Sequence, residues 1–141
     1  MCLQLNAQTC IQTFTASGQD DDPTVLTINA ADITCYGANP LTSLKLINPA
    51  GSLTSGSCTA DGSSWYGFDL SVDGGPIITG CAAAFNNLDI TGFTTLTITS
   101  HDDDVFSDEV TITIGVEATF VPLTPPSCVA VSSPLNGAIN V

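Results

Sequence analysis

Two runs of three aspartates are the part of this sequence best suited to chemistry. Residues 20–22 and 102–104 contain half of the twelve aspartates in a chain with one lysine and no arginine. Adjacent carboxylates repel one another, and a bound cation offsets that repulsion. Because carboxylate oxygens are the ligands that Ca²⁺ prefers, the composition favours a calcium site in these runs.

The second run has the better arrangement for holding an ion. Side chains alternate in direction along an extended chain, so Asp102 and Asp104 can converge while Asp103 faces away. Asp108 follows a short turn later and can add a third carboxylate. Since backbone carbonyls can complete the shell, we expect Asp102, Asp104 and Asp108 to bind Ca²⁺.

Asp20 and Asp22 form the corresponding pair in the first run. Loops gather at the two ends of a β-sandwich, so the two runs can meet at one calcium site. The spacing is not that of an EF-hand loop, and the alternative is a pair of solvated acidic loops. The only histidine, His101, has no second nitrogen or cysteine pair beside it, so it does not predict a zinc site.

Motifs for catalysis are missing from the sequence. A glycosidase needs one carboxyl group with a raised pKa in an apolar cleft, whereas both aspartate runs lie in polar segments. There is no G-x-S-x-G motif and no glycine-rich phosphate loop. We therefore expect no enzymatic activity from this domain.

Trp65 is the residue best suited to contact a sugar. It is followed by Tyr66, and adjacent strand residues face opposite sides, so Tyr66 shares the core face of Phe68 while Trp65 faces outward. An exposed indole near Asp61 can stack on a carbohydrate ring. The alternative is a tryptophan that covers a sheet edge or a domain contact.

The net charge of −13 restricts the partners of this protein. Lys45 alone cannot neutralise a row of phosphates, so nucleic acid is excluded, and anionic membrane surfaces repel the chain. No apolar run approaches the roughly 20 residues that cross a bilayer, so we expect no membrane insertion. An extracellular glycan or protein surface stays open as a partner, and so does the oligomeric state.

Cysteines at positions 2, 10, 35, 58, 81 and 128 include no C-x-x-C motif. Spread cysteines in an exported chain are typical of disulfides. We expect the pairs Cys10–Cys35 and Cys58–Cys81, with Cys128 left to pair outside this domain. Four cysteines allow other connectivities, and buried free thiols are the alternative.

Alternation of apolar and polar residues predicts strands along most of the chain. Within residues 109–120, every second residue from Val110 to Phe120 is apolar, which places these side chains on a core face. Asn48-Pro49-Ala50-Gly51 and residues 73–76 read as turns. Antiparallel strands, about eight in all, predict an all-β sandwich or jelly roll. The other expected strands are residues 12–16, 24–29, 43–47, 65–72, 77–79, 88–90 and 94–99.

Short segments at both ends of the chain resemble secreted proteins. Residues 1–7 look like the remnant of a signal peptide, and LNAQ before Thr-Cys resembles signals of Bacteroidetes-type secreted proteins. Residues 134–141, PLNGAINV, resemble the opening of immunoglobulin- or fibronectin-like repeats in surface proteins of that type. The resemblance implies the N-terminal module of a longer exported protein, either an adhesin or a modular hydrolase.

Residues 8–121 are therefore expected to form the sandwich domain. A proline-rich linker follows at 122–127, and a repeat domain begins at 128–141. We expect a secreted, extracellular module for cell-surface adhesion or spacing, stabilised by Ca²⁺ at its aspartate loops. The alternative is a carbohydrate-binding accessory module of a secreted hydrolase, with Trp65 and Asp61 in its site.

Overall fold

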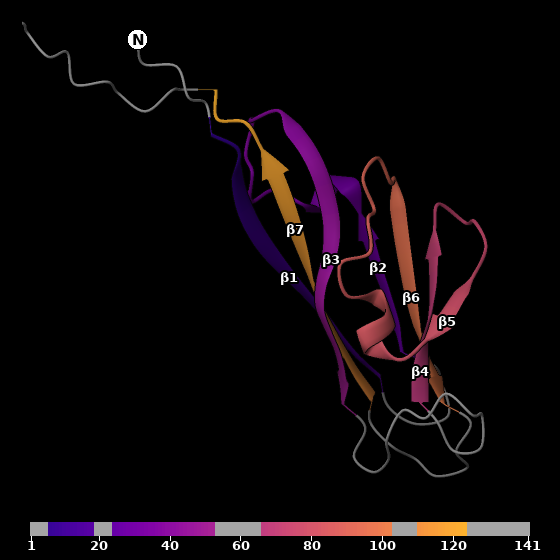
Figure 1. Ribbon diagram of the computed structural model, residues 1–141. Coiled ribbons are helices and arrows are strands. Elements are labelled where there is room, and N and C mark those ends of the chain that lie inside the picture. The colour runs from indigo at the N-terminus through magenta and orange to yellow at the C-terminus, as the bar shows by residue number, and fades with distance from the viewer. Residues whose placement is uncertain (1–5, 19–23, 53–65, 103–109, 124–141) are drawn as a thin grey trace, which may run out of the picture.

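The structure is a computed structural model that describes residues 6–18, 24–52, 66–102 and 110–123. Within these ranges seven strands form two antiparallel sheets (Figure 1). The three-stranded sheet has the order β1 (Gln8–Gly18), β7 (Val110–Phe120), β3 (Leu41–Ser52). The four-stranded sheet has the order β2 (Val25–Asn29), β6 (Thr95–Asp102), β4 (Tyr66–Val72), β5 (Ile78–Gly80). The predicted antiparallel β-sandwich is confirmed.

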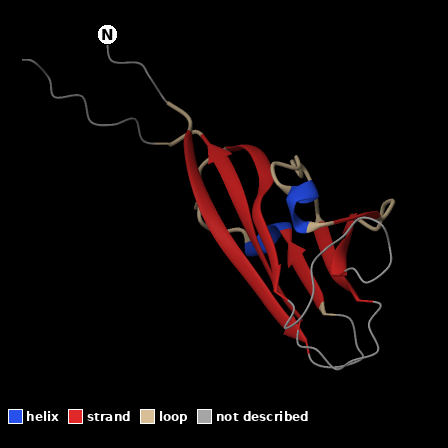
Figure 2. Cartoon of the chain, turned by 60° about the horizontal axis from the view of Figure 1, so that its bottom comes forward, coloured by secondary structure: helices blue, strands red, loops and turns tan. Residues whose placement is uncertain are grey.

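The core lies between the two sheets and follows the predicted alternation. β7 buries Ile112, Ile114 and Val116, while β6 buries Leu96 and Ile98. Alternate threonines on both strands face outward and are only partly covered. Because branched and threonine side chains fit a pleated, half-buried surface, these two sequences specify their strands locally. Among the described residues, the regular structure outside the strands is the 3-10 helices at Ala30–Asp32 and Ala82–Phe85, which are blue in Figure 2.

Gly115 is the exception to the alternation on β7. It faces outward with the threonines, yet it is buried, because Ile47 of β3 pairs with it and lies over it. A Cβ atom at position 115 would lie 2.9 Å from Ile47 Cγ1 and 3.1 Å from the Ile47 carbonyl oxygen. Glycine at this position therefore lets the outer surface close over the centre of the sheet.

Gly115→Ala is expected to lower the free energy of unfolding by about 1–3 kcal/mol, because the new methyl group overlaps Ile47. Urea unfolding of the variant measures this loss. Since the Ile47 carbonyl also blocks the site, Ile47→Ala combined with Gly115→Ala should recover only part of the overlap cost. A Gly115→Ala variant as stable as the wild type would contradict the close contact.

The segment from Asn48 to Gly51 is not the turn predicted from its sequence. β3 continues through it to Ser52, with a register shift between the pairs Ile47↔Gly115 and Ala50↔Thr113. Three steps on β3 thus face two on β7, which is the geometry of a β-bulge. Asn48 takes a left-handed φ of 48°, and its N–H donates to Asn86 Oδ1 over 3.0 Å. The bulge accommodates a proline that would otherwise break the strand.

Residues 88–90 do not form the strand predicted for them. They follow the second 3-10 helix, η2 (Ala82–Phe85), and make an isolated bridge between Asp89 and Lys45. Backbone hydrogen bonds nevertheless run along the edge of β3: Leu46 N–H donates to Leu88, Asn87 N–H to Leu46, and Ile90 N–H to Leu44. The apolar and polar residues alternate in residues 88–90 because the segment lies along the edge of β3, but its pairing with β3 is too short to form a strand. The predicted turn at residues 73–76 is present, with positive φ at Asp73 and Gly74.

Candidate functional site

The strand register places the flanks of both aspartate runs at one pole of the sandwich. β1 ends at Gly18, which pairs with Val110 at the start of β7. β6 ends at Asp102, which pairs with Tyr66 at the start of β4. In Figure 1 these strand ends lie together, opposite the end where β7 finishes. We call this end the loop pole.

A buried polar contact extends the β2–β6 pairing near the loop pole. Thr24, directly before β2, donates its N–H to Ser100 Oγ over 2.8 Å, and Ser100 N–H donates to the Thr24 carbonyl over 2.8 Å. Gly18 packs so closely on Thr24 that a Cβ atom at position 18 would overlap its hydroxyl. The chain segments that enter and leave the first aspartate run are therefore fixed against β6.

The predicted calcium ligands are only partly within the described residues. The backbone of Asp102 closes β6, whereas Asp20, Asp22, Asp104 and Asp108 lie outside the described ranges. The predicted sugar-binding residues Trp65 and Asp61 also lie outside them. The structure thus brings together the flanks of the two runs, and the ion site itself stays a prediction.

The described carboxylates serve local structure. In residues 6–18, 24–52, 66–102 and 110–123, no three His, Cys, Asp or Glu side chains are grouped to hold a metal ion. Asp73 Oδ1 accepts the N–H groups of Thr94 and Thr95 over 2.7 Å each, which fastens the β4–β5 turn to the start of β6. Asp89 accepts hydrogen bonds from the side chain and backbone of Thr91, and these hold the pKa of its exposed carboxyl below the ordinary value.

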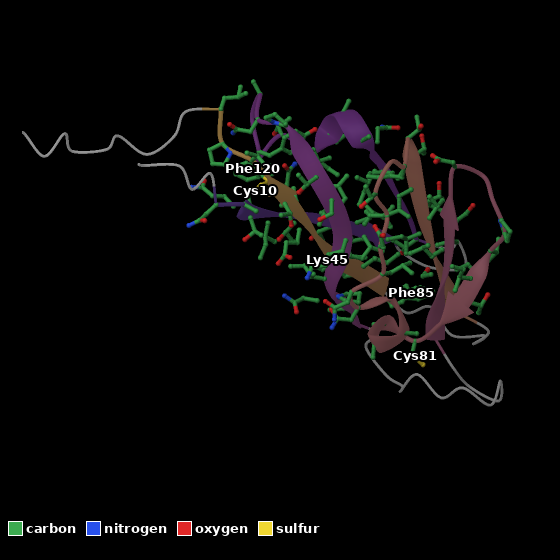
Figure 3. All side chains as sticks on the ribbon, turned by 45° about the horizontal axis from the view of Figure 1, so that its top comes forward. Cys10, Lys45, Cys81, Phe85 and Phe120 are labelled. Atoms are coloured by element: carbon green, nitrogen blue, oxygen red, sulfur yellow. A yellow bond between two sulfur atoms is a disulfide. The ribbon has the colours of Figure 1, made fainter. Side chains whose placement is uncertain are left out.

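A disulfide joins the start of β1 to the segment after the first 3-10 helix, η1 (Ala30–Asp32). The predicted Cys10–Cys35 pair is confirmed, with a Cα–Cα distance of 6.0 Å. Cys81 is also disulfide-bonded, but Cys58 lies outside the described residues, so that pairing stays a prediction. Figure 3 shows that Cys10 and Cys81 lie in different parts of the sandwich. Two separate regions are therefore cross-linked.

Gln12 strengthens the first of these cross-links in a way the sequence did not indicate. Its Nε2 donates to the Asp32 carbonyl over 2.6 Å, and its Oε1 accepts the N–H of Thr34 over 2.9 Å. The side-chain amide thus substitutes for a backbone ladder along the edge of β1. A glutamine in an alternating strand gives no local signal for such a long-range contact.

The only lysine of the chain is already paired. Lys45 Nζ lies 3.0 Å from Glu117 Oε1 on the outer face of the three-stranded sheet. Around this pair the face carries hydroxyls that contact across strands, such as Thr15 with Thr113 at 3.2 Å and Ser17 with Thr111 at 2.9 Å. Glu117 therefore neutralises the only lysine, and no arginine or second lysine in the sequence balances the other carboxylates.

No helix among the described residues is long and apolar enough to span a membrane. The chain was also compared with protein families, curated proteins and solved structures. None of these comparisons finds a match.

Proposed function

We propose that this domain is a secreted cell-surface adhesion module, held at one pole and carrying Ca²⁺-binding aspartate segments at the other. The observation that supports this proposal is the pairing of Gln8 with Phe120, which places the start of β1 beside the end of β7. Both ends of the domain therefore lie at the pole opposite the loop pole (Figure 1).

This placement favours adhesion over spacing. A spacer in a linear array needs its two connections at opposite poles, so that each module adds its length to the array. Here β1 and β7 each contain 11 residues. At about 3.3 Å per residue, strands of this length set the loop pole roughly 36 Å from the two ends of the domain. The sandwich then projects the loop pole outward, as an adhesive tip requires.

Calcium would act at the projecting end. The first aspartate run leaves β1 after Gly18 and returns at Thr24, and the second leaves β6 after Asp102 and returns at Val110. With these flanks at one pole, Ca²⁺ bound by Asp20, Asp22, Asp102, Asp104 and Asp108 would offset the repulsion among the carboxylates. Rigid loops bind with a smaller loss of conformational entropy, so the ion would also favour adhesion.

The disulfides support the extracellular part of the proposal. Cys10–Cys35 and the bonded Cys81 are typical of a protein that folds in an oxidising compartment. The signal-like residues 1–7 point the same way. A module exposed to proteases also gains from cross-links at two places, because local opening is restricted at both.

Thermal unfolding in EDTA, CaCl₂ and MgCl₂ tests the calcium site. At 100 times its Kd, Ca²⁺ should stabilise the fold by about 2.7 kcal/mol and raise the midpoint by several degrees. Asp102→Asn combined with Asp104→Asn and Asp108→Asn should abolish the rise, whereas Asp89→Asn is the control because Asp89 lies away from the loop pole on the edge of β3. Identical unfolding midpoints in EDTA and CaCl₂ would mean that the two aspartate runs are solvated acidic loops that bind no Ca²⁺.

A further inference from the structure

The last residues of β7 lie between two strands that are joined covalently. In the three-stranded sheet, β7 has β1 on one side and β3 on the other. Cys10 of β1 pairs with Ala118 of β7, and β3 begins beside Phe120. Cys10 is bonded to Cys35, and residues 35–40 lead directly into β3. We call residues 35–40, with their disulfide to β1, the strap, because they link β1 to β3 across the end of β7.

The strap also binds the residues that follow β7. The Val121 N–H donates to the Pro40 carbonyl over 3.0 Å. The Leu123 N–H donates to Asn39 Oδ1 over 2.9 Å, and Asn39 Nδ2 donates to the Tyr36 carbonyl over 2.7 Å. Hydrogen bonds to the strap thus continue beyond the last ladder pair of β7.

The inner side of the strap packs on the core. Cys10, Tyr36 and Leu41 are partly buried against the cluster that contains Ala118, and Phe120 is buried beside them. Figure 3 shows Cys10 and Phe120 at the same end of the sandwich, away from Phe85. The strap can therefore leave β7 only by exposing apolar side chains to water, which costs free energy.

Force that pulls the two ends of the domain apart acts first at this pole. Gln8 pairs with Phe120, so the first residue of β1 and the last residue of β7 are neighbours. Pulling them apart opens the antiparallel ladder from that pole, one pair after another, because each step works against a single pair. The opening reaches Cys10 after the pairs of Gln8 and Thr9. Without a further restraint, a ladder loaded in this direction gives way easily.

The disulfide supplies that restraint at Cys10. Beyond this residue, β1 cannot leave β7 without moving Cys35 and the rest of the strap. Moving the strap breaks the hydrogen bonds of Asn39 and Pro40 to the segment after β7 and uncovers the end of the core. Since forced unfolding is governed by the rate of unfolding, contacts that must break first affect it most.

We propose that the strap is a mechanical clamp, which keeps β1 and β7 together when the two ends of the domain are pulled apart. The disulfide carries the force from β1 to the strap, and Asn39 couples the strap to the end of β7. An adhesive module under tension would use this clamp. The clamp depends neither on the adhesion proposed above nor on its calcium site, because both ends of the strap lie at the pole opposite the aspartate runs.

Force-clamp measurements on the full chain, held at its two termini by peptide tags, test this proposal. At constant force, Asn39→Ala should raise the rate of rupture about tenfold, because it removes the hydrogen bonds to Leu123 and Tyr36. Asn86→Ala is the matched control. It removes a similar hydrogen bond, from the Asn48 N–H at the bulge, and should rupture at the wild-type rate.

Cys10→Ser combined with Cys35→Ser should raise the rate of rupture by more than Asn39→Ala does. The rupture step should also lengthen by roughly 80 Å, because the 25 residues that the disulfide closes into a loop can then extend. The longer step shows independently that the cross-link is absent. A double-serine variant with this longer step that ruptures as slowly as the wild type would overturn the proposal.

Phe85→Ala separates the clamp from overall stability. Its cavity should lower equilibrium stability more than the loss of the Asn39 hydrogen bonds does, but Phe85 packs on Phe68, away from the strap. With the strap controlling rupture, Phe85→Ala should raise the rate less than Asn39→Ala. Rupture rates that follow the thermal midpoints of the variants would instead mean that no clamp exists. Midpoints in EDTA and CaCl₂ report the calcium site separately.

Discussion

Phe85→Ala is expected to lower the free energy of unfolding by about 3–5 kcal/mol, the usual loss for a buried phenylalanine. Phe85 ends η2 and is 2% exposed. Its ring meets that of Phe68 edge to face, with the centroids 6.4 Å apart and an interplanar angle of 65°. Figure 3 shows the side chain directed into the sandwich from η2. Alanine would leave a cavity where the two sheets are closed from the side.

The loss of stability in Phe85→Ala should also be concentrated in one region of the fold. Phe85 fixes the segment whose backbone covers β3, through the N–H groups of Asn87, Leu46 and Ile90. Without the ring, these amides should exchange with solvent faster than those of β7. A cavity elsewhere in the core would lower global stability without this selective effect.

Urea unfolding and native-state hydrogen exchange measure the two effects. Phe85→Leu retains much of the buried volume and should lose less stability. Leu123→Ala is the exposed control, since Leu123 is 62% exposed and should change stability by less than about 0.5 kcal/mol. A Phe85→Ala loss below about 1 kcal/mol, or uniform exchange across the sheet, would show that η2 does not close the sandwich.

The strands that sequence predicted best are those whose surroundings are regular. β6 and β7 lie at interior positions of their sheets, so one face meets the core along the whole strand and the other meets solvent. Such strands carry a period of two in the sequence. Gly115 is buried although it faces outward, because Ile47 of β3 lies over it. The sequence of β7 alone could not predict a contact with another strand.

The errors arose where long-range pairing overrode local preference. Asn48 and Pro49 read as a turn because each favours one, yet β7 holds β3 extended on both sides of them and absorbs the extra residue as a bulge. The same limit applies to Gln12, whose partners are 20 and 22 residues away. A short stretch of sequence cannot predict hydrogen bonds between residues that are far apart in the chain.

For the candidate calcium site, the sequence likewise predicted some features, and others depended on the topology. Sequence identified Asp102 and Asp104 by their chemistry, because two carboxylates one residue apart can converge in extended chain. It also raised the possibility that both runs meet, but that depends on which strand ends share a pole. The pairs Gly18↔Val110 and Tyr66↔Asp102 supply this information, and they are set by topology.

Replacing both cysteines of the first disulfide, as Cys10→Ser with Cys35→Ser, is expected to cost about 3 kcal/mol. The cysteines are 25 residues apart in sequence, and opening a loop of that length restores conformational entropy to the unfolded chain. For a domain of this size the midpoint should fall by about 10 °C. Differential scanning calorimetry measures the change, and the double variant leaves the Cys81 bond in place, which a reducing agent would not.

Gln12→Ala separates the contribution of the Gln12 side chain to stability from that of the disulfide. The Gln12 amide holds the same segment through Asp32 and Thr34, so its loss should be larger in the double-serine background than in the wild type. A double-serine variant that unfolds at the wild-type temperature would mean that Gln12 holds the segment without the disulfide. The disulfide joins the start of β1, next to the end of β7, whereas the aspartate runs leave from the loop pole. A Ca²⁺ shift should therefore survive in the double variant, because the cross-link and the proposed ion site stabilise opposite ends of the sandwich.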